Sequence, residues 1–539
     1  MPYGSVSSSG NLPAAPRTTR PAVTDIDQAA PRRRNSQDRA ARREARQSGV
    51  GASAPSFIRR QIPFFELASE EGLAHIEQMS DRLLSEIGMD IRNDAVARDL
   101  FKAAGAEVHG DRVRFDPGLV RSLCATAPSQ FTQHARNPER SVQIGGDAIV
   151  FAPAYGSPFV RDLEGGRRYG SIADFENFVK LTYSTPALHH SGGTVCEPVD
   201  VPVNKRHLDM VYTHLRFSDK ALMGSVTEPS RAEESIEMMR IVFGADFVNE
   251  NCVILGNVNV NSPLVWDNTM TGALRTYAAA NQAPVVVPFI LGGAMGPVTT
   301  AGAIAQAHAE VLVGVALAQL TRPGAPVIYG NFLSSMALRS GSPTFGTPEP
   351  ALGSLIVGQL ARRVKLPLRC SGAFTASKVA DGQAMTESTV SMLAAIHCGA
   401  NFILHSAGWL EGGLAMGYEK FILDADFCSA LHTYCKGVDL SDEQFALDAF
   451  HEVGPGKHFF GSQHTLRHYE SAFWDSATAN NDSFEQWRDA GSSNTEDRAY
   501  AKSKQMLADY ERPPMDDAVD EALREFVTRR KADRIDMWY

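Results

Sequence analysis

The sequence has 539 residues, of which 43% are hydrophobic and 21% are charged, an ordinary balance for a globular protein. Its formal net charge of −10 repels polyanions on average, so we expect no nucleic-acid partner. The longest apolar run, residues 283–298, is interrupted by proline and glycine, which favours a buried strand and a turn over a membrane span.

Seven cysteines are widely spaced along the chain, and no two of them form a C-x-x-C pair. A zinc knuckle and a dithiol redox motif are therefore both excluded. An odd number of scattered cysteines is typical of a reducing compartment, so we expect a soluble cytoplasmic protein.

The first 56 residues hold nine arginines, no lysine and four acidic residues, and they show no periodic apolar positions. This composition predicts a disordered basic N-terminal arm over residues 1–56. From Ser69 the pattern becomes helical, with apolar residues from Ile76 to Ile87 at helix spacing. We predict an N-terminal α+β extension over residues 57–147.

Eight short apolar runs follow, about 31 to 42 residues apart: 148–152, 187–191, 221–226, 253–260, 284–291, 326–332, 366–374 and 401–409. Helix-like segments lie in most gaps, clearly so at 236–241, 303–320 and 351–364. Apolar strands that alternate with helices indicate a parallel sheet covered on both faces. We predict an α/β fold with a (β/α)8 TIM barrel over residues 148–414. An open doubly wound sheet is the alternative, but no G-x-G-x-x-G follows its first strand.

The remaining chain is predicted as a C-terminal helical cap over residues 415–539. Its helices are expected at Tyr418–Cys435, Ser441–Val453 and about 516–531. Exposed helices of a capped barrel often pair between copies, so we expect a homo-oligomer.

Loops that follow the strands of such a barrel build its active site. The predicted strand ends carry Tyr155, His189, His190, Glu228, Asn259, Asn261, Gly292, Gly293, Tyr329, Asn331, Phe374, His405 and Trp409. Aromatic and neutral polar groups dominate this set. Such a lining suits a quaternary ammonium ion, which offers no N–H and is held by aromatic faces at about 0.5–2 kcal/mol per ring. Core packing remains an alternative explanation for each aromatic residue taken alone.

Metal and nucleophile motifs are not found. His189 and His190 are adjacent, so on a strand they point to opposite faces and cannot share an ion. H-x-H, H-E-x-x-H and G-x-S-x-G are absent, and Cys370 falls in the middle of a predicted strand. We predict no metal site and assign no catalytic residue.

Residues 372–383, Gly-Ala-Phe-Thr-Ala-Ser-Lys-Val-Ala-Asp-Gly-Gln, resemble the segment of trimethylamine methyltransferases that carries pyrrolysine, with Phe374 in the place of the pyrrolysine. Further blocks match in order: 309–312, 318–320, 329–330, 346–349, 399–401, 408–411, 418–424 and 454–459. Together the blocks cover roughly residues 64–515. The sequence therefore resembles the pyrrolysine-free branch of this family.

The resemblance implies a (β/α)8 barrel that passes a methyl group to the Co(I) of a separate corrinoid protein. Phenylalanine cannot form the adduct that pyrrolysine forms with methylamines, whereas a quaternary amine already carries the charge that makes it a leaving group. Pyrrolysine-free relatives act on glycine betaine and similar compounds, so glycine betaine is the first substrate to expect. The chain has no D-x-H-x-x-G corrinoid motif, so the corrinoid (cobalamin) must come from a partner, or the acceptor is another group such as tetrahydrofolate.

The candidate substrate-binding residues are Tyr155, His190, Tyr329, Asn331, Glu349, Phe374, His405 and Trp409. A betaine carboxylate needs a donor, which His405, His190, Asn331 or Arg339 could supply. Glu349, with proline on both sides, is either a buried acid near the site or part of a structural turn. Carnitine, another betaine, choline or a sulfonium remain alternative donors, and a non-catalytic betaine-binding barrel remains an alternative function.

Overall fold

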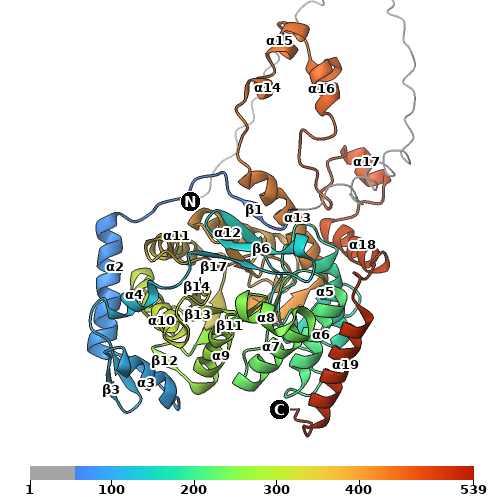
Figure 1. Ribbon diagram of the computed structural model, residues 1–539. Helices are drawn as coiled ribbons and strands as arrows, with labels where there is room; N and C mark the ends of the chain where they lie inside the picture. The colour runs from blue at the N-terminus through green and yellow to red at the C-terminus, as the bar shows by residue number, and fades with distance from the viewer. Residues whose placement is uncertain (1–54, 539) are drawn as a thin grey trace, which may run out of the picture. The chain divides into compact units, whose positions relative to one another are not determined.

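The computed structural model describes residues 55–538, so the predicted basic arm lies almost wholly outside the described residues. Its central feature is a row of seven parallel strands in the order β10-β11-β13-β14-β17-β18-β7. These strands are β7 (Ala148–Phe151), β10 (Leu222–Gly224), β11 (Ile254–Val260), β13 (Ala283–Leu291), β14 (Ile328–Gly330), β17 (Leu368–Ser371) and β18 (Phe402–Leu404). Helices surround the row, so the fold is mixed α/β (Figure 1).

Seven of the eight predicted strands are confirmed, and the second, residues 187–191, is wrong as a regular strand. In a regular strand a backbone carbonyl would accept the hydrogen bond of the Phe151 amide. Here Nδ1 of the His189 side chain accepts it instead, at 2.9 Å. The backbone of this segment still contacts both ends of the row. The amide of His189 donates to the Phe151 carbonyl at 3.0 Å, and that of Ser191 donates to the Ala221 carbonyl at 2.8 Å.

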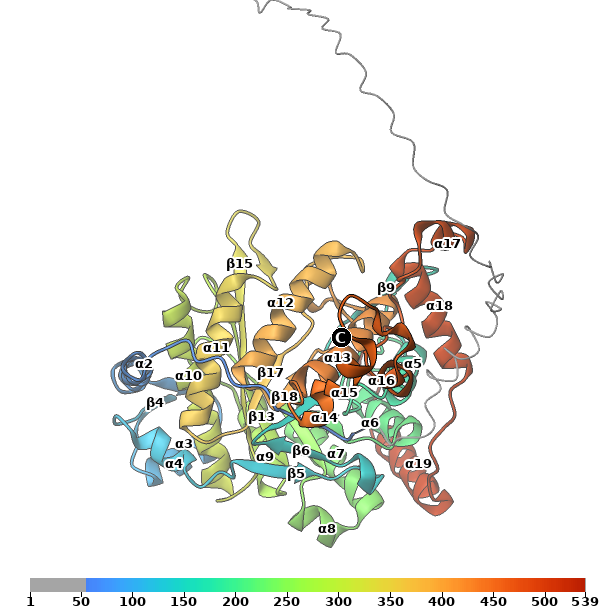
Figure 2. The same ribbon diagram turned by 90° about the horizontal axis from the view of Figure 1, so that it is seen from above.

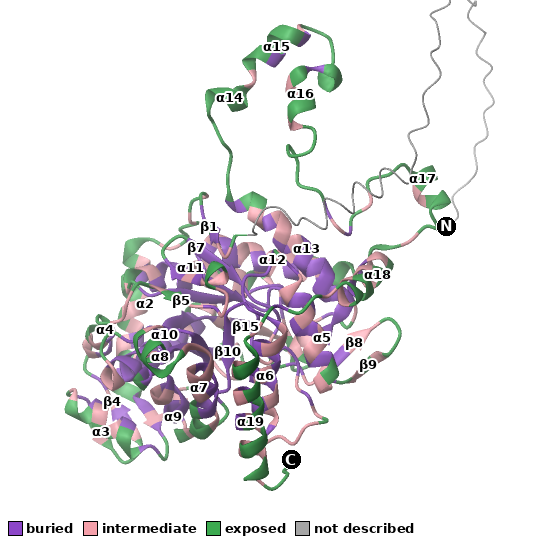
Figure 3. Ribbon diagram, turned by 45° about the vertical axis from the view of Figure 1, so that its right-hand side comes forward, coloured by how far each residue is buried: buried purple, intermediate pink, exposed green. Residues whose placement is uncertain are grey.

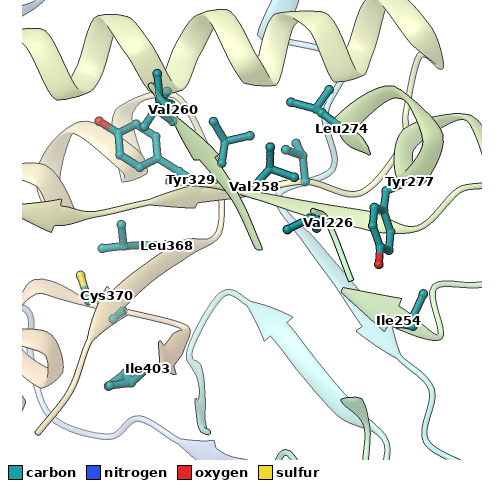
Figure 4. Close-up of a cluster of buried hydrophobic side chains, with 14 of the residues drawn as sticks. Val226, Ile254, Val258, Val260, Leu274, Tyr277, Tyr329, Leu368, Cys370 and Ile403 are labelled. Atoms are coloured by element: carbon teal, nitrogen blue, oxygen red, sulfur yellow. The ribbon is translucent and has the colours of Figure 1, made fainter. Parts of the chain in front are cut away.

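Helices follow most of the strands and cover the outer face of the row. They are α5 (Ile172–Tyr183), α6 (Arg206–Phe217), α7 (Pro229–Phe243), α8 (Ala245–Glu250), α9 (Asn268–Ala279), α10 (Thr300–Thr321), α11 (Pro348–Arg363), α12 (Gly382–Cys398) and α13 (Tyr418–Cys435). The helices predicted at 236–241, 303–320, 351–364 and 418–435 are all confirmed. Figure 4 shows the outer face, where Val258, Val260 and Tyr329 point toward a long helix.

Helix α10 is long and apolar enough to cross a membrane by length and composition alone. Its apolar window is 89% buried within the structure, and the core helix of a soluble protein passes the same test. Figure 3 shows α10 among the buried elements.

The inner face of the row has its own apolar core, built from residues that alternate with those under the helices. Val150, Met223, Leu255, Val285 and Phe402 belong to this inner cluster. The position of Gly330 on β14 requires a glycine, since a Cβ there would lie 2.4 Å from the carbonyl oxygen of Val286 on the neighbouring strand.

The N-terminal extension packs against α10, and its first strand pairs with β7, the last strand of the row. Strand β1 (Ile58–Arg59) pairs antiparallel with β7. Helix α2 (Glu70–Arg82) begins at Ser69, whose side chain caps the amide of Gly72, and continues as a π-turn to Ile87. The other elements are β2 (Met89–Ile91), α3 (Ala95–Ala103), β3 (Glu107–His109), β4 (Arg112–Arg114), α4 (Leu119–Cys124), β5 (Gln130–Gln133) and β6 (Val142–Gly145).

Several short strands extend the loops of the row. A four-stranded sheet has the order β19-β20-β8-β9, and β15 pairs with β16 in a hairpin. A two-residue strand, β12, joins the sheet of the N-terminal extension. The bounds are β8 (Phe159–Asp162), β9 (Gly166–Tyr169), β12 (Val265–Trp266), β15 (Phe332–Ala337), β16 (Ser342–Thr344), β19 (Trp409–Leu410) and β20 (Ala415–Gly417).

The C-terminal part is helical, as predicted. Helix α18 (Thr495–Ala508) packs on α13 and α5, and α19 (Asp517–Ala532) packs on α6 and α7. The single helix predicted at Ser441–Val453 is two helices, α14 (Asp442–Phe445) and α15 (Leu447–Val453), because Ala446 between them has a φ of 53°. With α16 (Gln463–His468) they stand apart from the helices around the sheet in Figures 1 and 3, and α17 (Phe484–Asp489) follows them. Figure 2 shows the same structure from above, where α14 to α16 overlap α13 in projection.

Candidate active site at the carboxyl ends of the strands

The inner face of the sheet becomes accessible at the carboxyl ends of the strands. On β11 every residue is buried except Asn259, which alternates with Val258 and Val260 of the outer face. On β13 the accessible residues are Phe289 and Leu291, and the ring of Phe289 lies edge-on to that of Phe332 at 4.7 Å. Solvent therefore reaches side chains at this end of an otherwise buried sheet.

Five aromatic rings gather here, and we call Phe332, Phe345, Phe374, His405 and Trp409 the ring cluster. Phe374 is at its centre. Its ring centroid lies 4.4 Å from that of Trp409, 4.8 Å from Phe332, 5.1 Å from Phe345 and 5.1 Å from His405. Residues from three separate connections, β14 to α11, β17 to α12 and β18 to α13, thus form one aromatic cluster.

Local contacts fix the two central rings. The segment after Phe374 is held by Glu387 of α12, whose carboxylate accepts from the Thr375 hydroxyl at 2.6 Å and the Ala376 amide at 2.8 Å. The ring of Trp409 lies directly on the backbone of Gly413. Only glycine fits there, because its φ is 97° and a Cβ would come within 2.4 Å of the indole.

His405 connects the ring cluster to a buried cation. Its φ of 63° is in the left-handed region, a conformation that is strained for a side chain such as histidine. Its Nδ1 accepts a hydrogen bond from Nη2 of Arg369 at 3.2 Å, which places the proton of the neutral ring on Nε2. Burial, and then the nearby positive charge of Arg369, hold the pKa of His405 well below its ordinary value.

Arg369 is the main charged group of the site. It lies on β17, faces inward and is 1% exposed. Nη1 donates to the Asn331 carbonyl at 2.8 Å and to the Ser371 hydroxyl at 3.1 Å. Within residues 55–538 no carboxylate forms an ion pair with it, and burial lowers its pKa to about 10. At neutral pH it is therefore a buried positive charge without a negative partner, an arrangement that proteins normally avoid.

Three buried polar atoms at this site have no hydrogen-bond partner among the described residues: Nε of Arg369, Oδ1 of Asn331 and Nε1 of Trp409. Asn331 itself is fixed, because its Nδ2 donates to the Ser354 hydroxyl at 2.9 Å. Buried polar groups are rarely left unpaired. The two unpaired donors, Nε of Arg369 and Nε1 of Trp409, therefore indicate a ligand that accepts hydrogen bonds beside the ring cluster.

The structure brings together three of the eight predicted site residues in the ring cluster: Phe374, His405 and Trp409. Asn331 contributes its backbone carbonyl to Arg369, while its side chain bonds Ser354 of α11. Tyr155 follows β7 and packs against the inner core, where burial raises its pKa to about 12.

The other three are not brought to the ring cluster. Tyr329 faces outward, and its hydroxyl bonds His308 of α10 at 3.0 Å. His190 bonds Gln133 of the N-terminal extension at 3.2 Å. Glu349 is exposed in the first turn of α11, so the structural turn, not the buried acid, is the correct interpretation. Arg339, considered as a carboxylate donor, is exposed in the turn between β15 and β16.

Sequence reasoning missed Arg369, Phe332 and Phe345. A signal for Arg369 was present, since an arginine between Leu368 and Cys370 places a charge inside a strand predicted to be buried. The two phenylalanines gave no such signal, because each is an ordinary apolar residue in the sequence. Among the described residues, no group of three His, Cys, Asp or Glu side chains could hold a metal ion.

Comparison with known proteins identifies the family. The model of the trimethylamine methyltransferase (MTTB) family matches residues 32–534. The chain belongs to this family. It is 39% identical over 470 residues to a glycine betaine methyltransferase of Desulfitobacterium hafniense (strain Y51), covering 87% of this chain and 98% of the relative.

Two further relatives come from Eubacterium limosum. A proline betaine:corrinoid methyltransferase is 25% identical over 409 residues, covering 74% of this chain and 84% of the relative. An L-carnitine:corrinoid methyltransferase is 28% identical over 401 residues, covering 71% of this chain and 80% of the relative.

Proposed function

We propose that this methyltransferase takes a methyl group from a quaternary amine that carries a carboxylate, with glycine betaine as the leading substrate, and delivers it to the Co(I) corrinoid of a separate protein. The observation that carries the proposal is Arg369, a buried cation that contacts the ring cluster and has no carboxylate partner within residues 55–538. A substrate carboxylate would supply the missing negative charge.

The cationic end of the substrate fits the ring cluster. A quaternary ammonium ion has no N–H to satisfy, so aromatic faces can hold it without any polar partner. The guanidinium carbon of Arg369 lies 5.4 Å from the centroid of Phe332, and one of its nitrogens lies 3.2 Å from His405. Anion and cation sites are therefore adjacent, as the single methylene between the two charges of glycine betaine requires.

The carboxylate end has matched donors. Nε of Arg369 has no acceptor among the described residues, and Nε2 of His405 carries a proton when Nδ1 accepts from Arg369. Charge-assisted hydrogen bonds from such donors are about twice as strong as neutral ones. Choline, which lacks a carboxylate, would leave Arg369 uncompensated, so the site favours betaines over choline.

The reaction needs positioning more than acid–base chemistry. The methyl carbon leaves the nitrogen, the electron pair of the broken N–C bond stays on nitrogen, and dimethylglycine departs as a tertiary amine. No proton has to be delivered to this leaving group. Co(I) supplies the electron pair for the new bond, and the rings and Arg369 hold one methyl group toward the accessible ends of the strands.

The relatives support a carboxylate-bearing donor. Glycine betaine, proline betaine and L-carnitine, after which three relatives are named, each combine a quaternary nitrogen with a carboxylate. Proline betaine and carnitine remain alternative substrates, as does a carboxylate-bearing sulfonium. Tetrahydrofolate as acceptor and a non-catalytic betaine-binding protein are the alternative functions.

We also propose that the sheet closes into the predicted (β/α)8 barrel. The segment 189–192 supports this, because its backbone bonds to β7 at one end of the row and to β10 at the other. It would take the place of the eighth strand. The cytoplasm remains the compartment we expect.

A thermal-shift screen tests the choice of substrate. A ligand that binds the folded state raises the melting temperature by mass action. Glycine betaine is expected to raise it, while choline (the same cation without the carboxylate) and trimethylamine at equal concentration raise it little. Equal shifts with betaine and choline would refute the role of Arg369. A shift with betaine but no methyl transfer to free or protein-bound Co(I) corrinoid or to tetrahydrofolate would favour the non-catalytic function.

A further inference from the structure

Residues 437–473, which we call the arm, leave the protein after α13 and return to it 37 residues later. At the outgoing end, the Cys435 carbonyl accepts from the Gln61 amide at 2.9 Å. At the returning end, Nε1 of Trp474 donates to the Ser429 hydroxyl at 2.8 Å. Both ends are thus fixed to the body, and α14, α15 and α16 lie between them, apart from it (Figures 1 and 3).

The arm is unusually apolar for an exposed segment. Nine of its large apolar side chains are more than half exposed, among them Phe445, Phe450, Phe460, Tyr469 and Phe473. Phe460 and Phe473 are 86% and 92% exposed. Exposed apolar surface gathered in this way marks an interaction site rather than ordinary surface.

The arm nevertheless has a defined fold. The rings of Phe450 and Phe459 meet edge-on at 5.3 Å, and the amide of Gln463 donates to the Glu452 carboxylate at 3.0 Å. These contacts hold α15 against the returning chain. Its three helices have only four, seven and six residues, whereas isolated helices shorter than about 12–15 residues are marginal in water. Such helices need packing that the exposed side chains do not find among residues 55–538.

A second apolar patch lies beside the root of the arm, and we call Phe65, His397 and Tyr434 the root patch. The amide of Phe65 donates to the His397 carbonyl at 3.0 Å, and the Tyr434 hydroxyl bonds the His397 ring at 3.1 Å. Phe65 and Tyr434 are 54% and 47% exposed. One chain therefore carries an apolar arm and an apolar patch at the same end.

We propose that two copies of this chain exchange arms, so that each arm packs on the root patch of the other copy. Such a contact is isologous, since each copy gives and receives the same surfaces, and it closes as a two-fold dimer. A stable interface needs about 20–30 residues on each side, which one arm and one root patch together supply.

The corrinoid protein is a less suitable occupant of the arm. The root of the arm lies beside Gln61 and β1, which pairs with the first residues of β7. It is therefore at the amino ends of the strands, whereas the ring cluster is at their carboxyl ends. A partner that receives a methyl group must approach the ring cluster and must also dissociate. A permanently exposed apolar arm needs a permanent partner.

Mass measurement of the full-length protein in solution, by light scattering after gel filtration, tests the proposal. The wild type is expected at the mass of two chains. Phe460→Glu combined with Phe473→Glu is expected at the mass of one chain, with an unchanged far-UV spectrum. Val96→Glu is the matched control, because Val96 on α3 is also exposed and apolar (54%) but belongs to the N-terminal extension. It should keep the wild-type mass. A single-chain wild type, or an arm variant that keeps the wild-type mass, would overturn the proposal.

Thiol labelling gives a second readout that does not depend on a disrupted dimer. All seven native cysteines are buried, so an introduced surface cysteine is the accessible thiol of the folded protein. Phe460→Cys should react with a maleimide at least tenfold more slowly than Val96→Cys. Equal rates for the protein alone, with protection of Phe460→Cys only after a corrinoid protein is added, would assign the arm to that partner and overturn the exchange. These readouts do not depend on substrate, so they are independent of the proposed function.

Discussion

Replacing Arg369 by methionine separates the carboxylate site from the cation site. Methionine fills a similar apolar volume but removes the charge and every donor. The substitution should weaken the binding of glycine betaine, whose carboxylate needs Arg369. It should not weaken the binding of choline, which depends on the rings alone.

The magnitude follows from the contacts of the guanidinium. Three of its five N–H groups donate to Asn331, Ser371 and His405, which leaves the N–H of Nε and one N–H of Nη2 for a ligand. A hydrogen bond to a charged group is worth about 1.5–3 kcal/mol, and burial of the pair favours the upper end. A loss of about 3 kcal/mol corresponds to about 100-fold weaker binding. Arg369→Lys keeps a charge but loses the planar fork, so it should fall between wild type and Arg369→Met.

Isothermal titration with betaine and choline measures both effects, and a melting curve without ligand measures stability. Removal of a buried unpaired charge is often neutral or stabilising, so the melting temperature of Arg369→Met should not fall. Equal losses of affinity for betaine and choline would refute the reasoning. So would a large drop in melting temperature, which would make Arg369 a structural residue.

Three other substitutions have defined outcomes. Trp409→Leu should weaken betaine binding roughly 2- to 30-fold through loss of about 0.5–2 kcal/mol of cation–π attraction, and Trp409→Phe should recover most of this affinity. Titration of both variants checks this, and an equal loss of affinity in the two variants would exclude a contact between the ring and the substrate. Burial lowers the pKa of His308 to about 4 from 6.5, so its contribution to stability is present above pH 6.5 and is lost as the pH falls toward 4. Urea denaturation measures the free energy of unfolding at pH 7 and at pH 5. The drop in this free energy between the two pH values should be about 2 kcal/mol smaller in His308→Asn than in wild type. An equal drop in both proteins would contradict the assignment. Lys420→Met should destabilise the protein by about 3–5 kcal/mol because the fully buried Asp424 loses its partner. The added change Asp424→Leu should restore much of this stability. A double variant no more stable than Lys420→Met would contradict the prediction.

The strands and helices that repeat along the chain can be predicted from local sequence pattern. The predicted strand at 187–191 is the exception, and a side chain is the cause. Apolar runs such as 253–260 and 284–291 become strands because both of their faces are covered, which a sequence displays directly. The run at 187–191, Ala-Leu-His-His-Ser, is also predicted as a strand, but there the imidazole of His189 accepts the hydrogen bond of the Phe151 amide. A bond between residues 38 positions apart cannot be seen in a local pattern.

The site was predictable where a residue type was unusual for its position. Phe374 was found through its resemblance to the pyrrolysine segment, and His405 and Trp409 through their positions after a strand. Tyr329 was placed on the wrong face, because the end of β14 was known only to within a residue and each residue along a strand reverses the direction of the side chain.

Single-turnover methyl transfer tests the central claim most directly. The purified protein is mixed without oxygen with Co(I) corrinoid, either free or on a corrinoid protein, and with glycine betaine. The absorption of Co(I) and the formation of dimethylglycine are followed together. We expect Co(I) to be lost in step with one dimethylglycine per methyl group transferred, and Arg369→Met to be far slower at the same betaine concentration. No dimethylglycine with either form of the corrinoid would contradict the proposed function.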